Sequence, residues 1–464
     1  MDSHETTGMT GIAGFSGEII LPGSDEYDTA RAVWNAMIDR RPGMIARCRN
    51  SEDVIAAVNH ARAHDLPISI RGGGHNVAGH AVCDDGLMID LSGMRAVTID
   101  PDNRIASVEG GALWADVDSA SQSHGLATPG GLISDTGVAG LTLSGGIGWL
   151  RAKHGLSIDN LVAAEVVTAN GQMVRASDDE NEDLLWALKG GGGNFGVVTR
   201  FEFALHPIGP EVMFVAPIYA VEDGPEPIRA WRDMMKEHGN LVGSLCEFST
   251  AGGEDFAEKD QGKRVYTLAC VYNGDAAEGE ALLQPLRELG TMVADFSGRM
   301  KYCEVQQLFD TLMPAGDFRC YWKARYLTDL SDEMISLAMQ NALSAPSDNS
   351  ISSLWNFGGA TAEVPAAATA FGDRSMGWMY SLDGVWTDPA DDARNIAWSR
   401  DGWESSAPFG HHGRAYLNFP GHGEDGDALT RTSFGENFQR LVEIKTKYDP
   451  HNRFRFNQNI QPEV

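Results

Sequence analysis

The sequence predicts an α+β protein with two lobes, and three observations support this fold class. The chain has 464 residues with enough apolar side chains to form more than one core. From Met44 onward, short strand-like segments alternate with helix-like ones. After Pro207 to Pro210, glycine-rich turns become fewer, while predicted strands and helices continue along the chain. This change predicts a second α+β lobe after the first.

The first lobe is expected to open with a capped helix over residues 50–65. Val54 and Val58 stand at helical spacing, Asn50 is a capping residue, and acidic residues follow it in the first turn. Further along, the patterns predict strands at 66–70 and 87–91, a hairpin of 94–99 with 105–109, a helix over 112–124, and strands at 162–168 and 197–205.

The second lobe is expected to combine a strand at 265–271 with helices at 276–288 and 332–343. The segment MGWMYSLDGVW predicts another strand, with Trp378, Tyr380 and Leu382 on one face and Met379, Ser381 and Asp383 on the other. One of these faces is expected to line a substrate cavity. A last helix is predicted from near Ser433 to Tyr448, where an Asp-Pro pair stops it.

Charge is the one extreme property of the composition. The formal net charge of −29 argues against nucleic acid or an anionic membrane as a partner. An acidic chain with few lysines resembles proteins of salt-accumulating halophiles, in which salt screens the repulsion. No long apolar run and no secretion signal are visible, so we expect a soluble, cytoplasmic protein. The six cysteines form no CxxC pair, which predicts free, mostly buried thiols and no metal site.

Three glycine clusters carry the functional signal: RGGGHN at 71–76, GVAGLTLSGGIG at 137–148 and KGGGGNFGVV at 189–198. Glycine allows positive φ and a close approach of backbone N–H groups, which suits an anionic phosphate. No cluster combines the G-x-G-x-x-G pattern with a strand that opens directly into a Rossmann helix and an acidic residue about twenty positions on, so a nicotinamide-binding fold is disfavoured.

These clusters, together with GLSIDN at 155–160, YLNF at 416–419 and YDPHNRF at 448–454, occur in a family order. The chain resembles the FAD-linked oxidases of the vanillyl-alcohol oxidase superfamily, with a PCMH-type FAD-binding domain, and more narrowly the berberine-bridge-enzyme-like branch. The resemblance implies an FAD-binding domain over residues 1–210, a substrate-binding domain with an antiparallel sheet and helices over 211–415, and a C-terminal segment, 416–464, that returns to the FAD lobe.

The resemblance also implies that FAD is attached covalently through His75, the histidine that follows the first glycine cluster. Bicovalent members of the branch carry a second link, from a cysteine in a GxCPTVG-like stretch. Here that stretch reads GGLISDTG, and Ile133 stands in the place of the cysteine. We therefore expect one covalent link, as in flavoproteins of the 6-hydroxynicotine oxidase type. His80 matches no motif position.

The family positions imply a set of cofactor-binding residues: Arg71, Gly72, Gly73, Gly74, His75, Asn76, Ser134, Gly137, Gly140, Leu141, Ser144, Gly145, Gly148, Asp159, Asn160, Gly196, Val198 and Asn457.

The catalytic acid–base group stays open among three residues. Tyr416 matches the tyrosine of the family Y-x-N-[YF] motif, and Tyr380 and Asp383 are alternatives on the strand that starts at Trp378. Asp373-Arg374 stands where the family often has His-Arg, which leaves the family substrates in doubt.

The function implied is transfer of a hydride from a small alcohol, amine or sugar to FAD, with O2 or another electron acceptor. The alternatives are a flavin-binding protein without turnover and a noncovalent NADPH-dependent flavin reductase.

Overall fold

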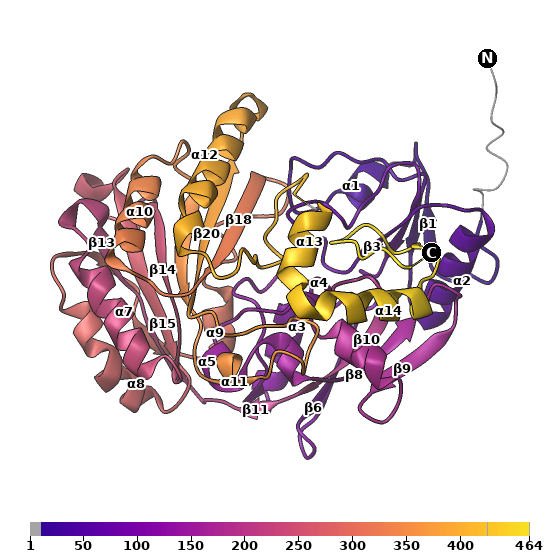
Figure 1. Cartoon of the computed structure of the whole chain (residues 1–464), viewed down its shortest axis with the longest axis horizontal. Helices are drawn as coiled ribbons and strands as arrows, with labels where there is room; N and C mark the ends of the chain where they lie inside the picture. The colour runs from indigo at the N-terminus through magenta and orange to yellow at the C-terminus, as the bar shows by residue number, and fades with distance from the viewer. Residues whose placement is uncertain (1–10, 425, 464) are drawn as a thin grey trace.

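The computed structural model describes residues 11–424 and 426–463, and the ends of the expected outer domains at positions 1–10 and 464 lie outside it. Two lobes lie side by side, one built on the N-terminal half and one on the middle of the chain (Figure 1). The α+β class is confirmed. Within the described residues, no helix is both long and apolar enough to cross a membrane.

Two sheets build the first lobe. The smaller has the strand order β1-β2-β4-β3, with β2, β3 and β4 parallel and β1 antiparallel to β2. The larger is antiparallel, in the order β5-β6-β10-β8-β9. Their strands are β1 (Glu18–Ile20), β2 (Met44–Arg47), β3 (Ile68–Arg71), β4 (Leu87–Asp90), β5 (Val97–Asp100), β6 (Ile105–Glu109), β8 (Leu161–Val167), β9 (Met173–Ser177) and β10 (Val197–Ala204).

One helix of the first lobe begins at a side-chain cap that the sequence predicts. The expected helix over 50–65 is α2 (Ser51–Ala63), and the Asn50 side chain accepts a hydrogen bond of 2.9 Å from the N–H of Asp53. The other helices are α1 (Tyr27–Arg31), α3 (Trp114–Gln122), α4 (Val138–Leu143), α5 (Arg151–His154) and α6 (Glu182–Leu188). A two-stranded pair joins β7 (Leu126–Ala127) to β11 (His206–Pro207).

A nine-stranded antiparallel sheet forms the second lobe. Its central order is β16-β13-β15-β14-β19-β20-β18, and β12 and β17 pair at the side of this path. The strands are β12 (Val212–Val215), β13 (Pro217–Ala220), β14 (Val242–Thr250), β15 (Arg264–Tyr272), β16 (Met292–Asp295), β17 (Gly298–Met300), β18 (Arg319–Leu327), β19 (Ile351–Asn356) and β20 (Trp378–Trp386).

Two short helices of this lobe contact helices of the first lobe, and the other helices cover the outer face of the sheet, which Figure 1 shows as the side away from the first lobe. Trp231, Tyr380 and Leu382 belong to the core between the sheet and these helices. The other face turns towards the first lobe, and its side chains include Leu245, Trp355 and Met379. The helices of the lobe are α7 (Glu226–His238), α8 (Ala276–Leu283), α9 (Tyr302–Gln307), α10 (Asp332–Leu343), α11 (Ala360–Glu363) and α12 (Asp392–Ser405).

The C-terminal segment returns to the first lobe, where Figure 1 shows its two yellow helices. The expected last helix is divided into α13 (Asp427–Phe434) and α14 (Phe438–Tyr448), because Gly435 adopts a φ of +55° between them. Leu441 and Ile444 of α14 pack in the same core as Val166 and Phe201 of the first lobe. This return brings the residues that follow Tyr448 beside the third glycine cluster: Asn194 donates a hydrogen bond of 3.1 Å to the carbonyl of Gln458.

Candidate active site

A cavity of about 310 Å³ lies where the two lobes and the C-terminal segment meet. Residues of all three glycine clusters line it, including Gly72 to Asn76, Gly137, Gly140 and Gly191 to Gly193. The inner face of the nine-stranded sheet closes the opposite side. Clusters that are far apart in the sequence therefore contribute to one site.

The first two clusters are in direct backbone contact. A Cβ atom added to Gly73 would lie 2.5 Å from the backbone N of Gly137, so neither position leaves room for a side chain. A Cβ atom at Gly140 or Gly193 would meet nothing within 4 Å, although both residues line the cavity. The glycines thus serve two purposes, close packing of the loops at one point and exposure of their backbone at others.

His75 lines the cavity and is held on two sides. Its ring stacks on Trp34, with ring centroids 4.4 Å apart and planes inclined by 21°. Its Nε2 atom is buried and lies 3.3 Å from Oδ1 of Asp135. Trp34 in turn donates a hydrogen bond of 3.1 Å from Nε1 to the carbonyl of Met313, another residue that lines the cavity.

Two acidic side chains of the sheet face the same cavity, Glu247 of β14 and Asp383 of β20. The strand register explains why they share a face: Glu247 pairs with Ser353 of β19, which pairs with Ser381, two residues before Asp383. Asp383 is 4% exposed, and its Oδ2 accepts a hydrogen bond of 3.2 Å from the hydroxyl of Ser381. Its Oδ1 is buried without a hydrogen-bond partner.

Burial destabilises the ionised form of both carboxyl groups. Burial raises the pKa of Glu247 to about 7. Burial also raises the pKa of Asp383 well above its ordinary value, and the charge of Glu247 adds to this effect. No Lys or Arg of the described residues lines the cavity, and no cation is among the groups that shift the pKa of either carboxyl.

Tyr416 lines the cavity between the second glycine cluster and Phe419. Its hydroxyl oxygen accepts hydrogen bonds from the backbone N–H groups of Gly146 and Ile147, each 3.3 Å, and one of 2.8 Å from Nδ2 of Asn418. Burial raises the pKa of Tyr416, and the Asn418 bond opposes that rise. The geometry ties this tyrosine to the glycine loop.

The structure distributes the remaining expected residues unevenly. Tyr380 does not line the cavity, because its face of β20 packs on the helices, where its hydroxyl accepts a hydrogen bond of 3.1 Å from Asn341. The alternation expected along this strand is confirmed, and Asp383 is on the cavity side. The expected residues that line the cavity are Gly72, Gly73, Gly74, His75, Asn76, Gly137, Gly140, Leu141, Ser144, Gly196, Val198, Tyr416, Asp383 and Asn457.

Four polar residues expected at the cofactor have other partners instead. Arg71 forms an ion pair of 2.6 Å with buried Asp90, and Ser134 donates hydrogen bonds from its N–H and Oγ to Asp310. Neither Arg71 nor Ser134 lines the cavity, and the same is true of Asp159 and Asn160.

The other two of these polar residues lie on the GLSIDN segment. Asp159 forms a two-bond ion pair with Arg374, and the Asn160 amide donates to the carbonyls of His154 and Leu156.

Gly145 and Gly148 shape the second loop without lining the cavity. An added Cβ atom would lie 2.8 Å from the Phe371 ring at Gly145 and 1.9 Å from the carbonyl oxygen of Gly130 at Gly148.

Sequence reasoning missed Glu247, Asp135 and Trp34. Glu247 is the one acidic residue in the strand VGSLCEFST, and a charge inside such an apolar strand was the signal available for it. Asp135 lies in the same stretch as Ile133, where the family resemblance concerns only a cysteine position. Trp34 reaches His75 across the tertiary fold and has no local signature.

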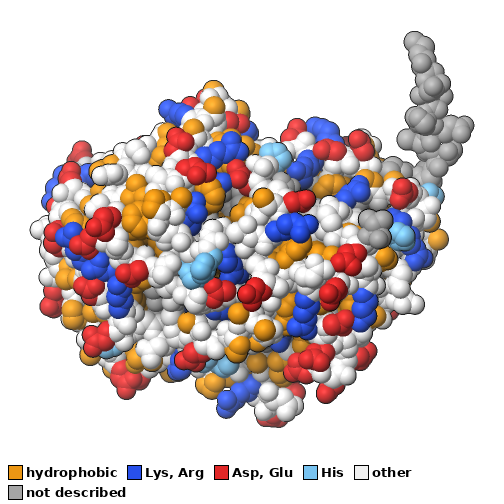
Figure 2. Space-filling view, viewed as in Figure 1, with side chains coloured by type: hydrophobic (Ala, Val, Ile, Leu, Met, Phe, Trp, Pro, Cys, Tyr) orange, Lys and Arg blue, Asp and Glu red, His pale blue; other side chains and the backbone are white. Residues whose placement is uncertain are grey.

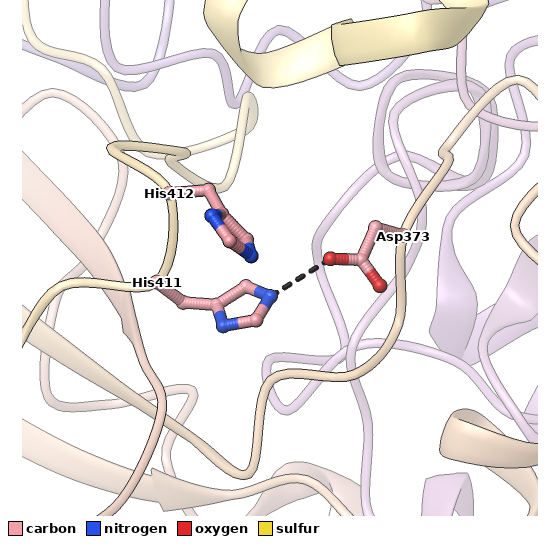
Figure 3. Close-up of side chains that lie close together, drawn as sticks. All are labelled: Asp373, His411 and His412. Atoms are coloured by element: carbon pink, nitrogen blue, oxygen red, sulfur yellow. Dashed lines mark hydrogen bonds and ion pairs between the residues drawn. The ribbon is translucent and has the colours of Figure 1, made fainter.

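A second polar cluster lies outside this cavity and consists of Asp373, His411 and His412, shown in Figure 3. Nε2 of His411 lies 2.8 Å from Oδ2 of Asp373, and its Nδ1 lies 3.2 Å from the hydroxyl of Thr328. Arg414 donates a hydrogen bond of 2.7 Å to the backbone carbonyl of Asp373. Both ring nitrogens of His411 already have protein partners, and a guanidinium is adjacent, so this cluster serves as a clamp between the two segments.

Comparison with known proteins assigns the chain to a family. The FAD binding domain family matches residues 42–177, and the berberine and berberine-like family matches residues 415–461. The FAD-linked oxidoreductase YgaK of Bacillus subtilis is 31% identical over 96% of this chain and 97% of its own length. The chain belongs to the berberine-like FAD-linked oxidoreductases. It is therefore an enzyme.

Other proteins similar to this chain have more specific names. The (R)-6-hydroxynicotine oxidase of Paenarthrobacter nicotinovorans is 30% identical, covering 96% of this chain and 97% of the relative. The crystal structure of 6-hydroxy-D-nicotine oxidase from Arthrobacter nicotinovorans matches with a TM-score of 0.85 at 27% identity, over 97% of this chain and 98% of that one. A chitooligosaccharide oxidase shares the fold, with a TM-score of 0.83 at 23% identity, over 97% of this chain and 98% of that one.

The cavity fits FAD, the cofactor of this family. Open glycine positions at Gly140 and Gly193 let backbone N–H groups approach phosphates, which a cavity lined by no Lys or Arg among the described residues needs. Oδ1 of Asn457 and Oε1 of Gln458 are buried without a hydrogen-bond partner and belong to residues that line the cavity. They are acceptors that a flavin or adenine N–H group can satisfy.

Proposed function

We propose that this FAD-linked oxidoreductase holds its flavin through one covalent bond to His75 and oxidises a small alcohol, amine or sugar, with O2 or another compound as electron acceptor. FAD, when bound, supplies the hydride acceptor. One observation carries the proposal: a single cavity connects His75, on the glycine loops, with the Glu247–Asp383 carboxyl pair on the sheet. A cofactor-anchoring group and an acid–base group thus face the same space.

The surroundings of His75 support its role as the attachment site. Stacking on Trp34 fixes the ring plane, and Asp135 is beside the buried Nε2 atom. The two atoms form no hydrogen bond, but a negative charge 3.3 Å from Nε2 favours the tautomer that carries the proton there, which leaves Nδ1 with a free electron pair on a ring that lines the cavity. We infer that Nδ1 is the nitrogen that bonds the flavin and that Asp135 stabilises positive charge on the ring while the bond forms.

A single link is supported by what surrounds the flavin site. Ile133 lines the cavity and has no nucleophilic atom. All six cysteines belong to the described part of the chain, and none of them lines the cavity. Cys83 is buried, and burial raises the pKa of its thiol, which lowers its reactivity further.

The carboxyl pair is the best-placed group to accept a proton from the substrate. A base is most effective when its pKa lies near the working pH, and burial raises the pKa of Glu247 to about 7. Tyr416 is less suited to this task, because burial raises the pKa of its phenol and three N–H groups already occupy its oxygen. We assign proton acceptance to the pair and loop positioning to Tyr416.

A substrate screen tests the proposed reaction. Purified enzyme is mixed anaerobically with alcohols, sugars and amines, and flavin absorbance is followed. Bleaching by a member of these classes, reversed by air, is the expected result. A flavin that only NADPH bleaches would indicate a reductase, and a flavin that nothing bleaches would indicate a carrier; either result would contradict the proposal.

Acid precipitation tests the covalent bond separately. We expect the wild-type flavin to stay with the precipitated polypeptide and His75→Ala to release it into the supernatant. His80→Ala is the matched control, because His80 also lines the cavity and should not affect attachment. Free flavin from the wild-type protein would refute the link.

A further inference from the structure

The side of the cavity that the sheet forms carries two acidic groups, and these bear on the class of substrate. Its polar groups on the sheet are Glu247, Ser353 and Asp383. Asp383 is 4% exposed, with one carboxyl oxygen buried and unpartnered. Two carboxyl groups enclosed together in a cavity that no described Lys or Arg lines carry a large desolvation cost, which the free protein lowers by holding protons on them. A ligand that brings a positive charge removes that cost.

Aromatic rings form the wall beside these carboxyl groups. Phe419 makes edge contacts with Trp322, at 5.3 Å between ring centroids, and with Trp355, at 6.2 Å. All three rings line the cavity, and Trp322 pairs with Asp383 in the register of β18 and β20. The faces of Trp and Phe rings attract cations, and their area accommodates an apolar body.

We propose that Glu247, Asp383 and the aromatic wall of Trp322, Trp355 and Phe419 form a subsite for a protonated amine, so that the substrate of this enzyme is an amine with an apolar body. The absence of Lys and Arg from the described cavity lining disfavours an anionic substrate. A neutral sugar brings no charge that could offset the cost of ionising these carboxyl groups, whereas an ammonium group pairs with the ionised carboxylates directly.

The subsite also prepares the amine for oxidation. A protonated amine has no lone pair to assist loss of hydride from its α-carbon. Transfer of the N–H proton from the ammonium nitrogen to a carboxylate of the pair restores that lone pair. The neutral amine can then lose a hydride, two electrons with one proton, to the flavin that the proposed function supplies, and it becomes an iminium ion. Binding and deprotonation thus use the same two residues.

Binding of an ion that cannot be oxidised tests the subsite without turnover. The probes are phenyltrimethylammonium and its neutral isostere tert-butylbenzene, titrated into flavin-loaded enzyme at pH 8 and followed by calorimetry and by the flavin spectrum. We expect the cation to bind at least tenfold more tightly than the isostere. Glu247→Gln should lower cation affinity at least tenfold and change isostere affinity less than twofold.

Glu280→Gln is the matched control, since it removes the same charge from a side chain that is 46% exposed and does not line the cavity. Retained flavin in each variant verifies folding. Equal affinity for cation and isostere, or equal effects of the two glutamine variants, would overturn the subsite.

This inference depends on the proposed function, but the two can fail separately. An alcohol or sugar that bleaches the flavin while the cation fails to bind would sink only the subsite. Cation binding with no bleaching by any compound would support the subsite and refute the oxidase.

Discussion

Arg374 and Asp159 form a buried ion pair with two parallel hydrogen bonds, Nη1 to Oδ2 at 2.7 Å and Nη2 to Oδ1 at 2.8 Å. Arg374 precedes β20 of the second lobe, and Asp159 belongs to the GLSIDN segment of the first. Their side chains are 1% and 10% exposed. Arg374, which matches the arginine of the His-Arg pattern common in the family, therefore joins the lobes through this pair.

Loss of this pair should strongly destabilise the protein. Arg374→Met leaves the Asp159 carboxylate buried without its partner, which typically costs about 3–5 kcal/mol in unfolding free energy. The control is Arg299→Met, because Arg299 and Glu280 are 45% and 46% exposed and such pairs contribute about 0–1 kcal/mol. Urea unfolding of both variants measures the difference. Equal losses would mean that the pair does not hold the lobes together.

The glycine clusters could be predicted as one site because backbone freedom leaves a strong trace in the sequence. The structure brings all three clusters to the cavity, and close packing of Gly73 on Gly137 explains why no side chain is tolerated there. Alternation along β20 was equally visible. The sequence could not decide which face meets the cavity, because both faces of this strand are buried, one against helices and one towards the first lobe.

Polar partners were the main failure of sequence reasoning. Asp159 and Ser134 stand at family motif positions, yet Asp159 pairs with Arg374 and Ser134 with Asp310, 176 positions away. A family motif indicates that a polar side chain is needed at a position, but it does not identify the partner with which that side chain forms a hydrogen bond or an ion pair. Glu247 shows the converse, since its importance comes only from the register that aligns it with Asp383 across β19.

Glu247→Gln should stabilise the ligand-free protein at alkaline pH. The unfolded chain releases this proton near pH 4.5, and the folded protein holds it until about pH 7. Stability is therefore highest at low pH and is lost as the pH rises through about 7, approaching about 3 kcal/mol for a shift of this size. The variant cannot ionise, so its advantage in unfolding free energy should be near zero at pH 4.5 and largest at pH 8.

Denaturant titrations across this pH range measure the effect. The other titratable groups around Glu247 are Asp383, His75, His80 and Tyr416 in the cavity lining, the adjacent Cys246, and Cys320, whose thiol pKa is raised in part by the charge of Asp383. Glu280→Gln serves again as the surface control and should show no such pH trend. A constant difference between wild type and Glu247→Gln at every pH would show that burial does not raise the pKa of Glu247.

Salt should raise the melting temperature of this protein. With 65 acidic and 36 basic residues, the net charge of −29 opposes folding at low ionic strength. Figure 2 shows red acidic side chains over both lobes on the visible face, with blue basic ones between them. Salt screens the attraction between acidic and basic side chains as well as the repulsion among the acidic ones. Because acidic groups are in excess, the repulsion is larger than the attraction, and its screening should dominate. Thermal unfolding in dilute buffer and in molar KCl decides the sign, and a flat response would remove the argument for adaptation to salt.

The number of flavin links can be changed at position 133. Ile133 lines the cavity in the stretch where bicovalent relatives carry a cysteine, and a thiolate is the species able to form the second bond. We expect the wild-type enzyme to give one flavin-labelled tryptic peptide, which contains His75. Ile133→Cys should give an additional product in which the flavin joins the His75 peptide to the peptide carrying position 133. Ile133→Ser, similar in size but without a thiol, should give only the first. A wild-type flavin that already links two peptides would refute the single bond, and the cysteine in the second peptide would identify the missed partner.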